Sequence, residues 1–237
     1  MKFKFGKKNI LITYHPVTLE KNTSAEQFKE ILLAVSKLKD TKLIFTYPNS
    51  DSFGRIIIKM IKKFDLSTAL LLVDVQKGIN DTNYYGGPNG RRNNLKAEIN
   101  IITVLEKWRK SERKVAFTKH NSREKGSPLK LNLESGQQLE GMDPMDNDIV
   151  VIKDVNSGFI GTSLELDLRR VGIQRLVVLG FFTNVCIETT VRMSGNLGFD
   201  TYLVHDACAA MNCIGHDKSD FDPDLVHNMA IANLHGE

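Results

Sequence analysis

The chain has few of the residues and patterns that mark several classes of protein. Its 237 residues include only three cysteines, Cys186, Cys208 and Cys213, and so sparse and odd a set argues against a disulfide framework. No stretch reaches the roughly 18 apolar residues of a membrane span. The N-terminus has no apolar core followed by a small-residue cleavage site. We therefore expect a soluble, cytoplasmic protein with reduced thiols and no membrane contact.

The chain also lacks a strong excess of positive or negative charge. The chain carries 32 Lys and Arg side chains against 28 Asp and Glu, a formal charge of +4, and the two signs are interspersed. Without a basic stripe there is nothing to favour nucleic acid as a partner. Metal motifs are absent too, because no HxH, HExxH or paired CxxC occurs around His120. We expect no metal and no cofactor, and a substrate-side or hydrogen-bonding role for His120.

Residues 1–64 predict a short βαβα fragment. Strands are expected over 9–14 and 42–47, and helices over 24–39 and 53–64. The first helix carries the apolar stripe of an amphipathic helix and has capping-box spacing between Ser24 and Gln27. Four elements make a thin domain, so their faces need a partner.

This fragment resembles a known enzyme family. The stretches KKNILITYHPVTLEKNTSAEQF and DTKLIFTYPNSDSFGRIIIKMI are similar to an internal part of the hydrolysing UDP-N-acetylglucosamine 2-epimerases. The resemblance places His15 at a functional histidine and Asn49 in the PN motif of that family. Such enzymes close two Rossmann-like domains over the nucleotide sugar, and the whole first domain and the later uridine-diphosphate-binding segment are absent here. We therefore expect a vestigial or fused fragment, with nucleotide-sugar binding as an alternative.

Residues 66–237 predict a second, larger domain. Strands are expected over 68–73, 114–119, 149–152, 176–179 and 201–204, and several of these are short, continuous apolar runs. Such runs are typical of strands buried on both faces of a parallel sheet. Helical patterns separate them, and the last helix is expected to be capped by Asp222, with Leu225, Met229 and Leu234 along it. The pattern predicts an α/β fold, a three-layer α-β-α Rossmann-like parallel sheet.

Three of these strands end in residues that can carry chemistry. Asp74 follows strand 68–73, Lys153 follows strand 149–152, and Cys186 follows a turn after strand 176–179. The carboxyl ends of parallel strands meet at one edge of a sheet, where ligands bind. Cys186 also stands at a strand-to-helix junction, where backbone N–H groups and the helix dipole favour a thiolate of lowered pKa. Taken singly, each residue could instead be structural: a turn aspartate, a solvated lysine, a core cysteine.

The motifs around these residues resemble a second family. LLLVDVQ, the lysine followed by SGFxGTxL, GxxTNVCIxTT and GFDTYLVHDACAA are similar to the isochorismatase-like cysteine hydrolases, which include nicotinamidases and N-carbamoylsarcosine amidases. The resemblance implies that Asp74, Lys153 and Cys186 form a catalytic triad. It also implies an oxyanion hole from the N–H groups of Phe182 and Cys186, with a cis peptide between Phe181 and Phe182. Positions expected to bind substrate are Gln76, Tyr84, His120, Phe159 and Asn184.

The resemblance implies hydrolysis of a small amide or related C–N bond through a covalent thioester. Substrate specificity is expected in residues 79–92, a candidate lid, and in the polar excursion 122–148. The metal-binding set of nicotinamidases is not found between Asp74 and His120, which disfavours nicotinamide. The family's last strand is also missing, so strand 201–204 is expected at a bare sheet edge. We expect a homo-oligomer, a dimer or tetramer. The alternative is a non-catalytic or chimeric binding module.

Overall fold

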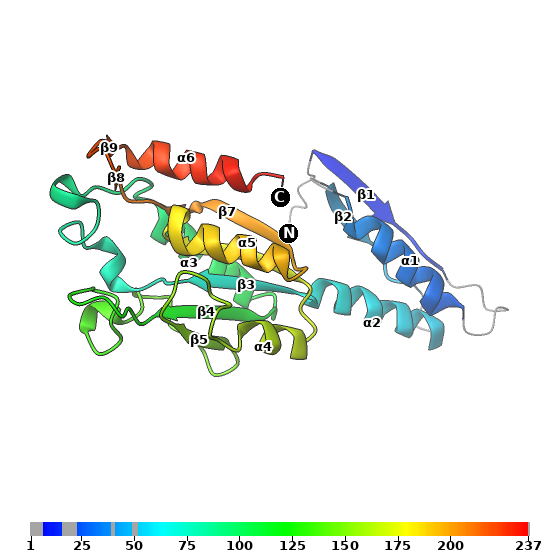
Figure 1. Ribbon diagram of the computed structural model, residues 1–237. Helices are drawn as coiled ribbons and strands as arrows, with labels where there is room; N and C mark the ends of the chain where they lie inside the picture. Colours follow the sequence, from blue (N-terminus) through cyan, green and yellow to red (C-terminus); the bar gives the residue numbers. More distant parts are fainter. Residues whose placement is uncertain (1–6, 16–22, 39–40, 49–51, 237) are drawn as a thin grey trace. The chain divides into compact units, whose positions relative to one another are not determined.

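The computed structural model describes residues 7–15, 23–38, 41–48 and 52–236 (Figure 1). The chain divides into two compact units, Met1–Leu66 and Ser67–Glu237. Among the described residues, no helix is both long enough and apolar enough to cross a membrane.

The first unit has the expected βαβα order. Strands β1 (Lys8–Ile12) and β2 (Thr41–Phe45) pair in parallel, and helices α1 (Ser24–Ser36) and α2 (Ser52–Leu66) each follow a strand. Among the described residues, its small core contains Phe28, Leu32, Ile57 and Ile61. The predicted capping box is wrong, because Ser24 is already the first helical residue and Thr23 stands at the N-cap without a side-chain bond to the helix backbone.

The second unit contains a five-stranded sheet in which every neighbouring pair is parallel. The strand order is β5-β4-β3-β6-β7. The strands are β3 (Thr68–Val73), β4 (Val115–His120), β5 (Ile149–Lys153), β6 (Arg175–Phe181) and β7 (Asp200–Ala209). All six residues of β3 are buried, as its apolar run predicts for a central strand.

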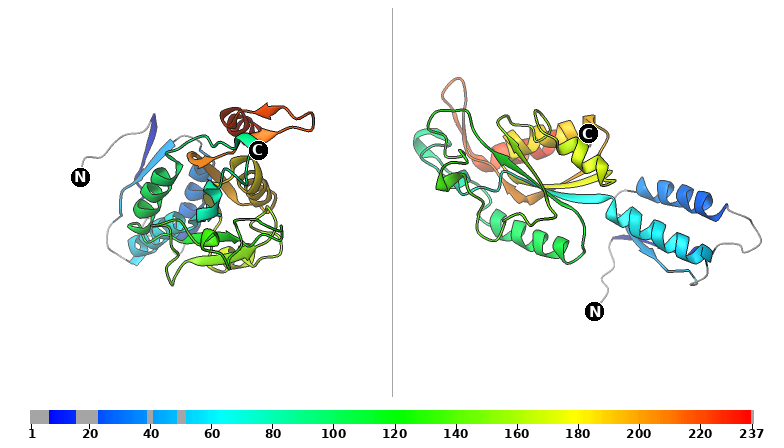
Figure 2. Two further views of the ribbon diagram at one scale, coloured as in Figure 1. Left: turned by 90° about the vertical axis from the view of Figure 1, so that its left-hand side faces the viewer. Right: turned by 90° about the horizontal axis from the view of Figure 1, so that it is seen from below.

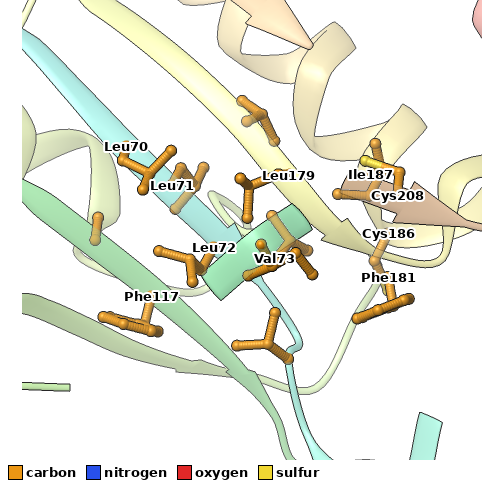
Figure 3. Packing of buried hydrophobic residues seen from close by; sticks show 14 of the residues in the cluster. Leu70, Leu71, Leu72, Val73, Phe117, Leu179, Phe181, Cys186, Ile187 and Cys208 are labelled. Atoms are coloured by element: carbon orange, nitrogen blue, oxygen red, sulfur yellow. The ribbon is translucent and has the colours of Figure 1, made fainter. Parts of the chain in front are cut away.

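Helices cover both faces of this sheet, which confirms the predicted three-layer architecture. Figure 2 shows α3 (Ala97–Arg109) on one face, with α4 (Leu164–Arg170) and α5 (Glu188–Asn196) on the other. Leu70, Leu72, Phe117 and Leu179 belong to the core between the layers (Figure 3). Within the described residues β7 ends the sheet, as expected. Assembly into a dimer or tetramer stays a prediction.

The last helix, α6 (Pro223–Leu234), begins as predicted, after Asp222. The Asp222 side chain accepts a hydrogen bond from the backbone N–H of Asp224 at 2.9 Å. The buried residues are Pro223, His227 and Ala230, whereas Leu225 and Met229 are about half exposed. Side-chain hydropathy alone therefore does not decide which face is buried; the helix contacts α5 and the turn after β6. A short hairpin, β8 (Cys213–Ile214) and β9 (Asp220–Phe221), precedes the helix.

Close packing at the end of the central strands depends on Gly180. It pairs with Val73 in the register of β3 and β6, and its φ is 126°. A Cβ atom at this position would lie 2.1 Å from the Val73 carbonyl oxygen. Only glycine fits this approach, which brings the segment after β6 beside the residue that follows β3.

Candidate active site

The sheet brings the three predicted catalytic residues together at one edge. Strands β4 and β5 lie on one side of β3, and β6 and β7 lie on its other side. The strand order therefore reverses between β3 and β6, and α/β sheets bind ligands at such a topological switch point. Lys153 Nζ donates a hydrogen bond to Asp74 Oδ2 at 2.6 Å and another to Cys186 Sγ at 3.3 Å. Figure 3 shows Cys186 among the buried residues Phe181, Ile187 and Cys208.

Asp74 is held by a residue that the sequence did not indicate. Thr118 Oγ1, on β4, donates to Asp74 Oδ1 at 2.6 Å, so each carboxylate oxygen has a partner. In return the Asp74 N–H donates to the Thr118 carbonyl oxygen and hydroxyl, at 3.1 and 3.2 Å. The φ of Asp74 is 52°, a left-handed conformation that aspartate tolerates better than most residues. The carboxylate, 1 % exposed, is thereby fixed in one orientation.

Lys153 is the hub of a buried hydrogen-bond network. Besides Asp74 and Cys186, its ammonium contacts His120 Nδ1 at 2.9 Å and the Val155 carbonyl oxygen at 3.1 Å. Burial lowers the pKa of Lys153, but the Asp74 carboxylate and Cys186 outweigh it and raise the pKa above its ordinary value. The lysine is therefore a fixed cation, and with Asp74 it forms a buried ion pair.

His120 serves this network as a neutral acceptor. Burial lowers the pKa of His120, and the charge of Lys153 lowers it further, beyond what Asp74 restores. A neutral imidazole can accept a hydrogen bond from the Lys153 ammonium at Nδ1, which leaves Nε2 available to a ligand.

These residues do not fit a metal ion. The ligand atoms of Asp74, His120 and Cys186 lie within 4.8 Å of one another, a spacing that could surround a cation. However, Lys153 Nζ hydrogen bonds with all three side chains. The ammonium already supplies the positive charge at the centre of the group, and it would repel a second cation.

The expectation of a lowered thiol pKa is wrong. Cys186 lies in the π-helical turn η4 (Thr183–Ile187), and α5 begins only after it, at Glu188. Its side chain is buried, and burial raises the pKa of the thiol, as does the neighbouring Asp74 carboxylate; Lys153 lowers the pKa by less. The resting group is therefore a protonated thiol beside an ion pair, because burial and the Asp74 charge together outweigh the charge of Lys153.

The peptide bond between Phe181 and Phe182 is cis, as the resemblance implied. The assignment of the oxyanion hole to the N–H groups of Phe182 and Cys186 stays a prediction.

A pocket of about 440 Å³ opens over these residues. Five predicted residues besides Phe182 line it: Asp74, Tyr84, His120, Asn184 and Cys186. Its walls include residues from 79–87 and 122–129, parts of the two segments in which the sequence places specificity. The size is within the range of small-molecule sites, roughly 300–1,000 Å³.

Two predicted substrate-binding residues lie outside the pocket lining. Gln76 is fully buried; its amide nitrogen donates to the carbonyl oxygens of His120 and Gly136, and its oxygen accepts from the His120 N–H at 2.7 Å. Gln76 thus holds the end of β4 in place. Phe159 stacks on Phe199 with ring centroids 6.0 Å apart and belongs to the core. Both residues lie in the sequence motifs of Asp74 and Lys153, but this position along the chain did not predict what their side chains contact.

Other lining residues were not among the predicted site residues. Glu124 contacts the Tyr84 hydroxyl, and Cys213 contacts Asn184 from a hairpin far along the chain. Tyr85, Asn156, Met211 and Asn212 also line the pocket. The excursion and the hairpin reach the site only through tertiary packing, so no fixed spacing connects them with Asp74 or Cys186.

The predicted epimerase residues are placed as follows. His15 is exposed in a segment without regular structure after β1. Asn49 lies outside the described residues.

Family models match two parts of this chain. The isochorismatase domain matches residues 68–234, and UDP-N-acetylglucosamine 2-epimerase matches residues 2–85. The isochorismatase family protein YrdC of Bacillus subtilis (strain 168) is 42 % identical over 169 residues, which is 71 % of this chain and 88 % of YrdC.

Solved structures share the fold. An isochorismatase-family protein from Chromobacterium violaceum ATCC 12472 is 35 % identical with a TM-score of 0.66, over 72 % of this chain and 86 % of its own. A cysteine hydrolase from Pseudomonas syringae pv. phaseolicola 1448A is 24 % identical with a TM-score of 0.61, over 73 % and 86 %. At that identity the likeness shows the fold alone.

Proposed function

Because the chain belongs to the isochorismatase family, we propose that this hydrolase cleaves a small amide or related C–N bond through a thioester on Cys186. The observation that carries the proposal is the position of Lys153 between Asp74 Oδ2 and Cys186 Sγ, at 2.6 and 3.3 Å, beneath a pocket of small-molecule size. A thiol, a carboxylate and a fixed cation are the parts that covalent hydrolysis needs.

The raised thiol pKa assigns a definite role to Asp74. A protonated thiol is a weak nucleophile, so its proton must leave as Sγ attacks the carbonyl carbon. Asp74 is the base that takes this proton. Lys153 stabilises the negative charge that develops on sulfur, and its hydrogen bond to Asp74 Oδ2 at 2.6 Å holds the carboxylate beside the thiol.

The remaining steps regenerate the thiol. The attack forms the C–S bond and a tetrahedral oxyanion; the C–N bond then breaks, and the nitrogen leaves as ammonia or an amine with the proton from Asp74. Water attacks the thioester while Asp74 accepts its proton, the C–S bond breaks, and the proton returns to sulfur as the carboxylic acid departs. The N–H groups of Phe182 and Cys186 are proposed to stabilise the oxyanion, where loss of one donor typically costs about 3–4 kcal/mol.

Two measurements test the proposal together. Ammonia release from a panel of small primary amides is compared for the wild type and for Cys186→Ala, which should lose hydrolysis. Rapid acid quenching followed by mass spectrometry should find an acyl group on the Cys186 peptide and not on Cys213, which lines the same pocket. Hydrolysis that survives in Cys186→Ala, or turnover without any acyl adduct under burst conditions, would contradict the thioester route.

A further inference from the structure

The ionisable side chains of the pocket leave one uncompensated charge. Asp74 is neutralised by Lys153 at 2.6 Å, and the Lys153 charge and burial lower the pKa of His120. Among the described residues that line the pocket, none is Lys or Arg, and the acidic ones are Asp74 and Glu124. Glu124 therefore gives the pocket a net negative character.

Glu124 is held in place at the pocket wall. The Tyr84 hydroxyl donates a hydrogen bond to Glu124 Oε2 at 2.6 Å. The Tyr84 backbone is itself anchored, since its N–H donates to Asp81 Oδ1 at 3.2 Å. A hydrogen bond to a carboxylate is stronger than one between neutral groups, so the carboxylate has a preferred position although Glu124 is exposed.

Aromatic rings connect this carboxylate with the turn that carries the thiol. The Tyr84 and Tyr85 rings pack edge to face with centroids 4.8 Å apart, and Tyr85 packs in the same way on Phe182 at 4.9 Å. All three residues line the pocket. The faces of such rings attract cations, and a wall of rings next to a carboxylate suits an ammonium group.

The cations near the pocket lie outside its lining and have other partners. Lys130 donates through Nζ to the carbonyl oxygen of Ser122 at 3.1 Å. Arg123, next to Glu124, donates through Nε to Asp154 at 2.6 Å. Arg91 pairs with Asp220 at 2.7 Å, and Arg92 pairs with Glu98 at 2.6 Å. None of these arginines belongs to the lining. A substrate carboxylate or phosphate would therefore meet Glu124 without a compensating side-chain cation.

We propose that Glu124, with the Tyr84–Tyr85–Phe182 wall, selects amide substrates whose non-reacting end carries a positive charge. This inference rests on the proposed amide hydrolysis for its reaction, but the charge preference is a property of the pocket itself. Substrates with an ammonium group at that end bind through the carboxylate and the ring faces. Substrates with a carboxylate there are repelled.

A matched series of three primary amides tests the proposal. The compounds share one chain length and end in trimethylammonium, hydroxyl or carboxylate. We expect wild-type kcat/KM for the cationic amide to exceed that for the anionic amide about tenfold or more, the combined size of one attraction and one repulsion at a partly exposed site. Glu124→Gln should bring the ratio close to one, and Glu124→Lys should invert it. Glu140→Gln, an exposed carboxylate outside the lining, should leave the ratio unchanged.

Binding to Cys186→Ala separates this inference from the proposed reaction. Calorimetry of Cys186→Ala with the three amides should show the same order, and the double variant with Glu124→Gln should lose it. If no amide is hydrolysed but binding follows this order, the selectivity holds and the proposed reaction fails. If hydrolysis occurs with a ratio that neither Glu124 variant changes, the inference is overturned and the reaction stands. If neither turnover nor charge-dependent binding is seen, both are overturned.

Discussion

His227 on α6 is hydrogen bonded through Nδ1 to the hydroxyl of Thr183 at 2.8 Å, inside the protein. Thr183 is the first residue of the π-helical turn that contains Cys186. The last helix is thus hydrogen bonded directly to the turn that holds the proposed nucleophile. The protonation state of His227 bears on this contact.

This contact predicts a pH-dependent stability. Burial lowers the pKa of His227, and the nearby His205 lowers it further. In the unfolded chain, His227 takes up a proton as the pH falls through its ordinary pKa of about 6.5. In the folded protein it does so only at a lower pH. The free energy of unfolding therefore decreases as the pH falls, until the lower folded-state pKa is passed. His120, whose pKa is also lowered, acts in the same direction. Urea unfolding should show lower stability at pH 5.5 than at pH 7.5.

Replacing His227 should weaken this dependence. We expect His227→Asn to reduce the stability difference between the two pH values, while His216→Asn, which changes an exposed histidine, keeps the wild-type difference. An unchanged difference in His227→Asn would show that the imidazole contributes nothing to it.

The Asp74 carboxylate raises the pKa of Cys186, which makes Asp74→Asn an informative variant. Removing the charge should lower the thiol pKa, so iodoacetamide should alkylate Cys186 faster at a given pH than in the wild type. The same variant should lose amide hydrolysis, because the base is gone. Peptide mapping by mass spectrometry measures the first effect, with the fully buried Cys208 as an internal control. Slower alkylation in the variant would contradict the pKa assignment.

Thr118→Val should destabilise the site without creating a large cavity. The substitution removes the donor to Asp74 Oδ1 and leaves a buried carboxylate oxygen without a partner, a loss of about 1–3 kcal/mol. Urea unfolding measures the change. Thr103→Val, which removes a hydroxyl bonded only to its own helix at Ile99, should cost much less. An equal decrease in the free energy of unfolding in the two variants would contradict a specific stabilising role of the hydrogen bond between Thr118 and Asp74.

Gly180→Ala and Gly195→Ala should have opposite effects. A Cβ atom at residue 180 would lie 2.1 Å from the Val73 carbonyl oxygen at a φ of 126°, and we expect the variant to be insoluble or strongly destabilised. A Cβ atom on Gly195, in helix α5, meets nothing within 4 Å, and alanine there should stabilise the protein by about 0.5–1 kcal/mol. Soluble expression and melting temperature report both. A Gly180→Ala variant as stable as the wild type would rule out the close approach of β3 and β6.

The sequence was sufficient to predict the residues that meet at the end of the sheet. Short apolar runs such as 68–73 can be recognised locally, because a strand buried on both faces needs apolar side chains throughout. Parallel connection then forces the ends of these strands to one edge, so Asp74, Lys153 and Cys186 could be placed together without knowing the strand order.

Only the tertiary structure decided how these residues behave. The sign of the Cys186 pKa shift depends on how completely packing removes the thiol from water, and desolvation has no local sequence signature. The same holds for Thr118 against Asp74 and for Glu124 in the pocket wall, which reach the site from separate strands and loops. Gln76 and Phe159 stand in the right motifs but do not line the pocket. Position along the chain determined which strand end each residue occupies, and three-dimensional packing determined what its side chain touches.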